Sequence, residues 1–171
     1  MIKMKKIYLF TILLAGFGST AFAQVSSTAT STATIVTPIS IAKTIDMNFG
    51  NVAVSATAGT VVLAPAGTRT PTGGVTLPVT AGTVTAASFT VTGTAGYTYA
   101  ITLPTTAVTL INGTFNMTAA AFTSTPTTTG TLSAGGTQTL NVGATLAVAA
   151  SQAAGLYAST ASGFTVTVNY N

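Results

Sequence analysis

The sequence predicts an all-β sandwich. Short segments in which apolar and polar residues alternate recur along the chain, and turns that contain Gly or Pro separate them. Helical spacing of apolar residues is missing, apart from a weak signal over residues 147–154. The most regular segment covers residues 163–171 and places on one face Phe164, Val166, Val168 and Tyr170. Thr or Asn occupies the other face, so this segment is predicted to be an amphipathic strand.

Residues 1–23 are predicted to form a secretory signal peptide. Three lysines precede a mostly apolar run over residues 7–14, and Ala21-Phe22-Ala23 supplies the small-x-small cleavage pattern. Cleavage is expected before Gln24. The apolar run is shorter than the ~20 residues that cross a bilayer as a helix. We therefore expect a secreted protein that passes through the periplasm and ends at the cell surface.

Charge is scarce once the leader is removed. Only Lys43, Asp46 and Arg69 remain, so the net charge falls from +4 to +1. This leaves no basic patch for nucleic acid, and weak charge repulsion favours self-association. The chain has no cysteine, so its stability must come from packing and sheet hydrogen bonds.

Residues 24–36 are predicted to be an N-terminal extension of a sandwich domain over residues 37–171. From Val25 to Ile41 the odd positions are small or apolar and the even ones are mostly Ser or Thr, over more residues than a typical strand of ~5–6. Pro38 marks a kink or an edge position. One interpretation is an extended arm followed by the first strand, and the other is a disordered tail.

The first half of the domain is predicted to contain several short strands. Phe49 is expected to be a core anchor, followed by a turn at Gly50-Asn51. Strands are expected over residues 60–64 and 75–79, with a loop between them. The alternating runs at 87–92 and 97–103 are predicted to form a hairpin around Gly93–Gly96.

The second half is predicted to contain the longest internal strand. An alternating run over residues 115–121 precedes it. The long strand is expected to bury one face made of Leu140, Val142, Ala144, Leu146 and Val148. A connection over residues 149–161 then leads to the last strand.

The sequence offers no constellation for catalysis. His, Cys and Glu are absent, so a Ser–Lys dyad on Lys43, or an amide bond from Lys43 to an Asn promoted by Asp46, are the candidates that remain. An exposed ion pair between Lys43 and Asp46 is favoured over both. One carboxylate cannot build a calcium site and zinc ligands are missing. We therefore expect no enzyme, no cofactor and no metal site.

The chain resembles domain-of-unknown-function family 4402. The resemblance rests on Asn48-Phe49-Gly50 after an Ile-rich strand, on the Thr/Ala/Gly richness, and on Gly155-Leu156-Tyr157 followed by the segment from Phe164. More distantly, the chain is similar to spore-coat-U-like proteins and chaperone–usher pilin subunits. The resemblance covers essentially the whole mature chain.

This resemblance implies a fibre subunit with an incomplete immunoglobulin-like sandwich. In such pilins a chaperone first fills an apolar groove beside the C-terminal strand, and the next subunit's N-terminal arm then replaces it. The matching groove edge is Phe164, Val166, Val168 and Tyr170, and the matching donor arm carries Val25, Ala29, Ala33 and Ile35. The implied partners are other copies of the chain, a periplasmic chaperone and an outer-membrane usher. The chain departs from those pilins in lacking a disulfide and in having a less apolar donor arm.

Two other functions remain open. A monomeric secreted module that binds carbohydrate or a surface would need an exposed aromatic platform, for which Tyr97, Tyr99 and Tyr157 are the candidates. Membrane insertion of the mature chain is a third interpretation. Expected strands shorter than the ~9–11 residues of a spanning strand argue against it.

Overall fold

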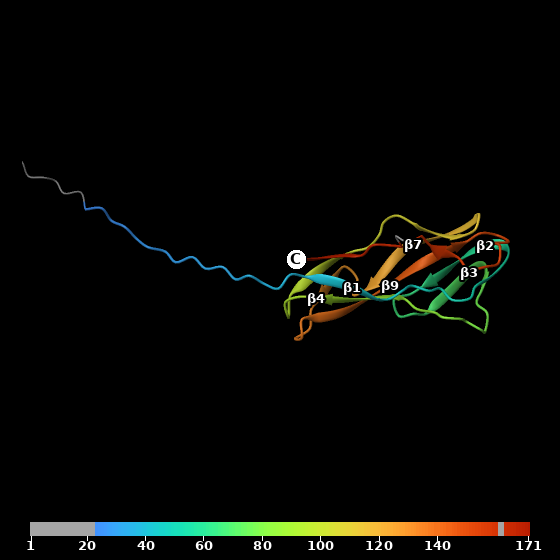
Figure 1. Cartoon of the computed structure of the whole chain (residues 1–171), viewed down its shortest axis with the longest axis horizontal. Helices are drawn as coiled ribbons and strands as arrows, with labels where there is room; N and C mark the ends of the chain where they lie inside the picture. The colour runs from blue at the N-terminus through green and yellow to red at the C-terminus, as the bar shows by residue number, and fades with distance from the viewer. Residues whose placement is uncertain (1–22, 161–162) are drawn as a thin grey trace, which may run out of the picture. The chain divides into compact units, whose positions relative to one another are not determined.

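The computed structural model describes residues 23–160 and 163–171, and most of the predicted signal peptide lies outside this range. The described residues form eleven β-strands and no helix, so the predicted all-β class is confirmed (Figure 1). The strands are β1 (Ser40–Ile45), β2 (Ala53–Leu63), β3 (Arg69–Thr76), β4 (Ala87–Thr92), β5 (Thr98–Thr102), β6 (Val108–Asn112), β7 (Phe115–Thr125), β8 (Thr129–Thr131), β9 (Thr137–Val148), β10 (Ala158–Ser159) and β11 (Thr167–Tyr170).

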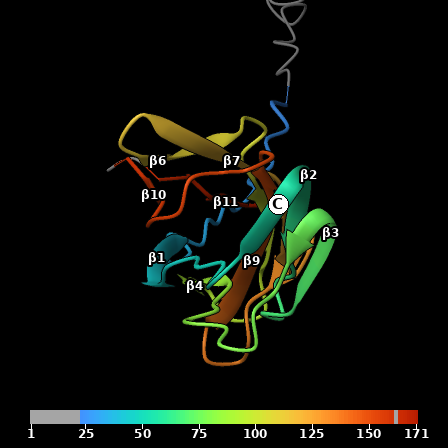
Figure 2. The ribbon, with the colours of Figure 1, turned by 90° about the vertical axis from the view of Figure 1, so that its right-hand side faces the viewer.

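The strands form two antiparallel sheets of unequal size. The large sheet has the order β1-β4-β9-β7-β6-β10, and β2 joins it by pairing with both β9 and β3. The small sheet has the order β11-β5-β8. The large sheet curls strongly. In Figure 2, β6 and β7 lie at one end of the domain, β2 and β3 on one side, and β1 and β4 at the opposite end.

Strand β9 is the centre of the large sheet. One of its edges pairs with β7, while the other pairs first with β4 and then with β2. The change of partner occurs at Gly143, where a Cβ would overlap the carbonyl oxygen of Leu63. All five side chains that were expected to share a buried face of this strand are buried.

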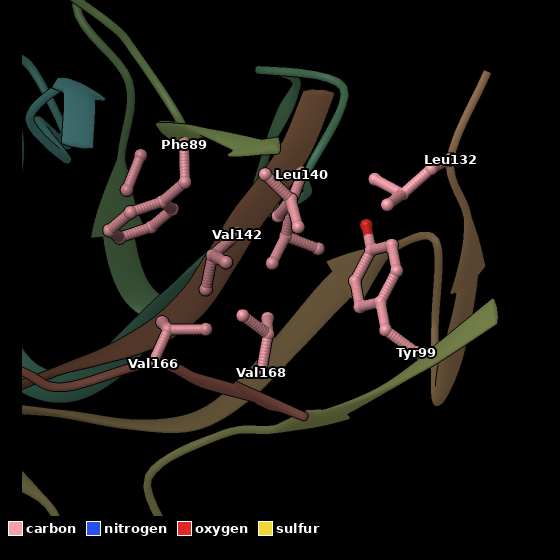
Figure 3. Packing of buried hydrophobic residues seen from close by; sticks show 9 residues of the cluster. Phe89, Tyr99, Leu132, Leu140, Val142, Val166 and Val168 are labelled. Atoms are coloured by element: carbon pink, nitrogen blue, oxygen red, sulfur yellow. The ribbon is translucent and has the colours of Figure 1, made fainter. Parts of the chain in front are cut away.

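Two groups of buried side chains make up the core, and β9 contributes to both. The first group lies between β9 and the small sheet. In Figure 3, Val166 and Val168 point from the C-terminal segment toward Val142 and Leu140, and Tyr99 points toward Leu132. The second group contains the predicted anchor Phe49 with residues of β2, β3, β7 and β9. The C-terminal strand is therefore a core element, as its alternation predicted.

The predicted hairpin at residues 87–103 is wrong. Both strands exist, but β4 pairs with β1 and β9, whereas β5 pairs with β11 and β8. The connection after β4 therefore crosses from one sheet to the other. Alternation reports only that each strand has one buried face, and it cannot tell which strand is the neighbour.

The alternation expected for residues 115–121 changes phase at Ala121. This residue has a φ of 50°, and the register between β7 and β9 shifts between Ala120 and Thr123. Met117 and Ala119 face inward before this bulge, and Phe122 and Ser124 face inward after it. Ala121 is consequently exposed, because a bulge moves all later side chains to the other phase.

Several strands are longer than the sequence predicted. β2 and β7 each have 11 residues and β9 has 12. β2 and β3 form a long hairpin that turns at residues 64–68; a loop or hairpin tip was expected over residues 65–74, so the tip is confirmed and is shorter than expected. Strand length therefore does not by itself argue against membrane insertion. Among the described residues, no helix is long and apolar enough to cross a membrane.

Candidate functional site

A groove of about 1000 Å³ with an apolar floor opens in the domain formed by residues 35–171. One wall is the segment 43–52, which includes the end of β1, and the other wall contains residues 155–160, 163 and 164. The floor between the walls consists of side chains from β4, β6, β7 and β9, namely Ala87, Phe89, Val108, Leu110, Met117, Ala119, Phe122 and Leu146. The groove is open to solvent, and its floor is the apolar part of its lining.

Aromatic rings line the part of the groove near the small sheet. The ring of Phe164 lies 4.9 Å from that of Phe122 in a tilted arrangement and 6.2 Å from that of Phe89, edge to face. Phe164 is only partly buried, because its outer side borders the groove. An apolar side chain that entered here would contact ring faces and edges, which favours burial of a further apolar group.

The few charged groups lie outside the apolar floor. Lys43 Nζ donates a hydrogen bond to Asp46 Oδ1 at 2.6 Å, and both side chains are largely exposed. The exposed ion pair expected for these two residues is therefore confirmed. Within residues 23–160 and 163–171 no group of three or more His, Cys, Asp or Glu side chains could hold a metal ion.

Two strands with a free edge, β1 and β11, lie near the groove without running along it. Among the described residues, β1 pairs only with β4, and β11 pairs only with β5. The two strands belong to different sheets and approach each other without forming a ladder. Each free edge offers unpaired N–H and C=O groups, which is the usual template for an added strand. Lys43 of β1 and Phe164, shortly before β11, both line the groove, so the edges meet it at this end.

The four predicted acceptor residues differ in their surroundings. Phe164 borders the groove, whereas Val166 and Val168 are buried against the core of their own domain. Thr165, Thr167 and Asn169 are exposed, so the predicted alternation is present, although the hydrogen-bonded strand covers only β11. An incoming strand would therefore meet the backbone edge of β11 and the ring of Phe164, not the side chains of the two valines.

Tyr170 makes a connection that sequence patterns do not reveal. Its hydroxyl accepts a hydrogen bond from the N–H of Thr94 at 2.7 Å and donates one to the carbonyl oxygen of Thr37 at 2.8 Å. Thr37 N–H also donates to Thr94 Oγ1 at 3.0 Å. Gly93 leaves room for this hydroxyl, since a Cβ there would overlap it. We call Thr37, Thr94 and Tyr170 the tyrosine clasp.

Most of the predicted donor arm belongs to a unit separate from the domain, and this unit ends at Thr34. Residues 23–34 contain no helix or strand, and their side chains are exposed. Val25, Ala29 and Ala33 belong to this stretch, and Ile35, which follows it, is also exposed. The first strand of the domain begins at Ser40, and the roles assigned to the arm residues stay predictions.

Arg69 is a second residue whose role the sequence did not reveal. Its Nη1 donates hydrogen bonds to the carbonyl oxygens of Phe49 at 2.6 Å and Asn51 at 2.8 Å. Within the same turn, Asn48 Oδ1 accepts a hydrogen bond from the N–H of Gly50. This turn forms part of the 43–52 wall of the groove, so the hydrogen bonds of Arg69 stabilise that wall. The one hint in the sequence was that Arg69 is the single arginine of a chain with very few charged residues.

The three candidate tyrosines do not form an exposed aromatic platform. Tyr99 is fully buried, and its hydroxyl donates to Gln138 Oε1 at 2.8 Å. Tyr97 is about half exposed and packs edge to face on Tyr170. Tyr157 lies in the groove wall, where its hydroxyl donates to the carbonyl oxygen of Ala153.

The family model described as Domain of unknown function (DUF4402) matches residues 39–170. The chain belongs to the DUF4402 family. The DUF4402 match contains both walls and the floor of the groove, both free strand edges, and every member of the tyrosine clasp except Thr37. The predicted resemblance to this family is therefore confirmed. No curated protein and no solved structure matches the chain.

Proposed function

We propose that this DUF4402 protein is a structural subunit of a bacterial surface fibre, secreted through the periplasm, and that it polymerises by strand donation. The N-terminal arm of one copy would lie in the groove of the next. The observation that carries this proposal is the groove of about 1000 Å³ with an apolar floor, near two strand edges that have no partner among the described residues.

Strand addition suits this groove for a physical reason. Main-chain hydrogen bonds to a free edge provide affinity, and alternate side chains enter the apolar floor. The arm alternates with the same period of two, and the low net charge of the mature chain opposes association only weakly. Before polymerisation the groove would expose its aromatic floor to water, so a periplasmic chaperone and an outer-membrane usher are proposed as transient partners.

The composition of the arm limits how strongly it binds. Its inward-facing set consists of Val, Ser and Ala up to Ala33, and only Ile35 is large and branched. Burial contributes roughly 25 cal/mol per Å² of apolar surface, so small side chains add little. We expect Val25 and Ile35 to contribute more than Ala29 or Ala33.

Deletion of residues 24–34 tests the proposal. The mature chain should form polymers that are seen by size-exclusion chromatography and electron microscopy, and the deletion variant should stay monomeric. A synthetic peptide with the sequence of residues 24–36 should bind the deletion variant and raise its melting temperature, as any ligand of the folded state does. A peptide of the same composition in scrambled order is the control.

Two results would contradict the proposal. Polymers that form equally well without residues 24–34 would show that the arm is not the donor. A mature chain that stays monomeric at every concentration would favour the alternative function, a monomeric secreted module that binds carbohydrate or a surface.

A further inference from the structure

The tyrosine clasp lies at the end of β1 that is remote from the groove. β1 starts near Thr92 of β4, next to the clasp, and ends near Ser88, where Lys43 and Asp46 line the groove. β11 runs the other way and brings Tyr170 to the clasp end. The arm therefore joins the domain at the end of β1 opposite to the groove.

The arm is long enough to reach its own groove if the chain reverses directly before the clasp. A hairpin that paired Thr34 with Thr37 would place Ala29 opposite Ala42 and Val25 opposite Asp46. Such a self-complemented monomer would satisfy the free edge of β1 and could not polymerise. Chain length alone does not prevent this outcome.

The clasp opposes the reversal because it engages the backbone groups of Thr37 that pairing with Thr34 would need. The N–H of Thr37 donates to Thr94 Oγ1, and its carbonyl oxygen accepts from the Tyr170 hydroxyl at 2.8 Å and from Thr94 Oγ1 at 3.4 Å. Pro38 follows, and the residue before a proline is restricted to extended conformations. A turn would thus have to form at Ile35-Val36, and β-branched residues are poor turn formers in comparison with Gly, Asn or Asp.

We propose that Tyr170 is a positioning residue that commits the arm to another copy of the chain by preventing it from folding back along β1. This inference rests on the proposed function, and it assigns to Tyr170 a role in the choice between self-complementation and polymerisation. The ring of Tyr170 packs against the ring of Tyr97, and the hydroxyl is the group of Tyr170 that forms a hydrogen bond with Thr37.

A disulfide trap separates the two outcomes in one experiment. The chain has no cysteine, so the double variant Ala29→Cys/Ala42→Cys reports only the arm and β1. Cα atoms that face each other in an antiparallel pair are ~4.5–5.5 Å apart, which suits a disulfide. The mature chain is oxidised at low concentration, and non-reducing gels with mass spectrometry count the disulfides within one molecule and between molecules.

Four backgrounds are compared. With Tyr170 present, disulfides should form between molecules. Tyr170→Phe keeps the ring and removes the hydroxyl, and the intramolecular fraction should rise about five- to tenfold, the change that corresponds to one lost hydrogen bond. Ile35→Asn/Val36→Gly keeps Tyr170 and introduces an Asn-Gly turn, so it should give mainly intramolecular disulfides. Tyr99→Phe also removes a bonded hydroxyl, at a residue outside the groove, and is the control that should leave the ratio unchanged.

The results distinguish this inference from the proposed function. If Tyr170→Phe changes the ratio no more than Tyr99→Phe does, or if intramolecular disulfides already dominate with Tyr170 present, the inference is wrong. If no variant forms disulfides between molecules, donation of the arm to the edge of β1 is wrong, while the intramolecular fraction still reports whether the clasp prevents folding back.

Discussion

At the scale of single residues, the two cationic side chains of residues 35–171, Lys43 and Arg69, have different roles. Arg69 reaches two backbone carbonyl oxygens of the turn that carries Phe49. Lys43 forms an exposed ion pair with Asp46 at the groove rim. A guanidinium that donates to two carbonyls contributes more to stability than an exposed pair, because water competes for the exposed charges.

Arg69→Met should therefore lower the free energy of unfolding by about 1.5–3 kcal/mol, the range for hydrogen bonds that involve a charged group. Denaturant unfolding of the variant that lacks residues 24–34 measures this value without interference from polymers. Lys43→Met is the matched control and should change stability by about 0–1 kcal/mol. Equal effects of the two substitutions would show that the turn does not depend on Arg69.

At the scale of elements, β9 connects the two core groups because it changes its partner from β4 to β2. Gly143 allows this change, since the backbone at the end of β2 passes directly over it. The position is buried, and the atoms that a Cβ would meet belong to the backbone and cannot move aside independently.

Gly143→Ala should cost about 1–3 kcal/mol, as overpacking of a core does. Thermal and denaturant unfolding of the same truncated variant measure the cost. Gly135→Ala is the control, because a Cβ there would lie 3.7 Å from Ser133 Oγ, at an ordinary contact distance. A stable Gly143→Ala protein would imply that β2 moves away from β9 easily.

The small sheet has its own titrating group in Tyr99. Burial raises the pKa of Tyr99 above its ordinary value of about 10. The folded state therefore favours the neutral phenol more than the unfolded state does. Its contribution to stability is complete below pH ~10 and is lost as the pH rises toward the folded-state pKa.

Stability of the truncated variant should decrease above pH ~10, and Tyr99→Phe should make that decrease smaller. Denaturant midpoints measured between pH 8 and pH 12, approximate limits on either side of the ordinary tyrosine pKa, test this. Identical pH dependence in both proteins would contradict a buried neutral Tyr99. Tyr97→Phe is the control, because Tyr97 is about half exposed and directly precedes β5.

At the scale of the whole domain, the groove adjoins one part of the second core group. Ala119 and Ala144 are both buried in the second core group, but only Ala119 borders the groove. The same enlargement should therefore have different effects at the two positions. Close packing surrounds Ala144, and empty space adjoins Ala119.

Ala144→Leu should destabilise the truncated variant by about 1–3 kcal/mol, whereas Ala119→Leu should be tolerated with a smaller loss. Ala119→Leu should also weaken binding of the arm peptide, because its side chain would occupy the groove. Isothermal titration with the peptide and denaturant unfolding measure both effects. Strong destabilisation by Ala119→Leu with unchanged peptide binding would mean that the groove is not the peptide site.

The sequence alone determined the all-β class, the buried face of β9, the core position of Phe49 and the exposed ion pair. These features follow from side-chain alternation, turn residues and charge, which are properties of neighbouring residues. The membership in DUF4402 was also visible, because its short motifs lie in the chain itself.

Only the tertiary structure decided which strands are neighbours. Alternation in residues 87–103 is the same whether its two strands pair or face each other across two sheets, and the bulge at Ala121 shifts the phase without a glycine to announce it. The groove and the tyrosine clasp join residues far apart in the chain, such as Thr37 and Tyr170. Contacts of this kind depend on long-range packing, and a local pattern carries no information about them.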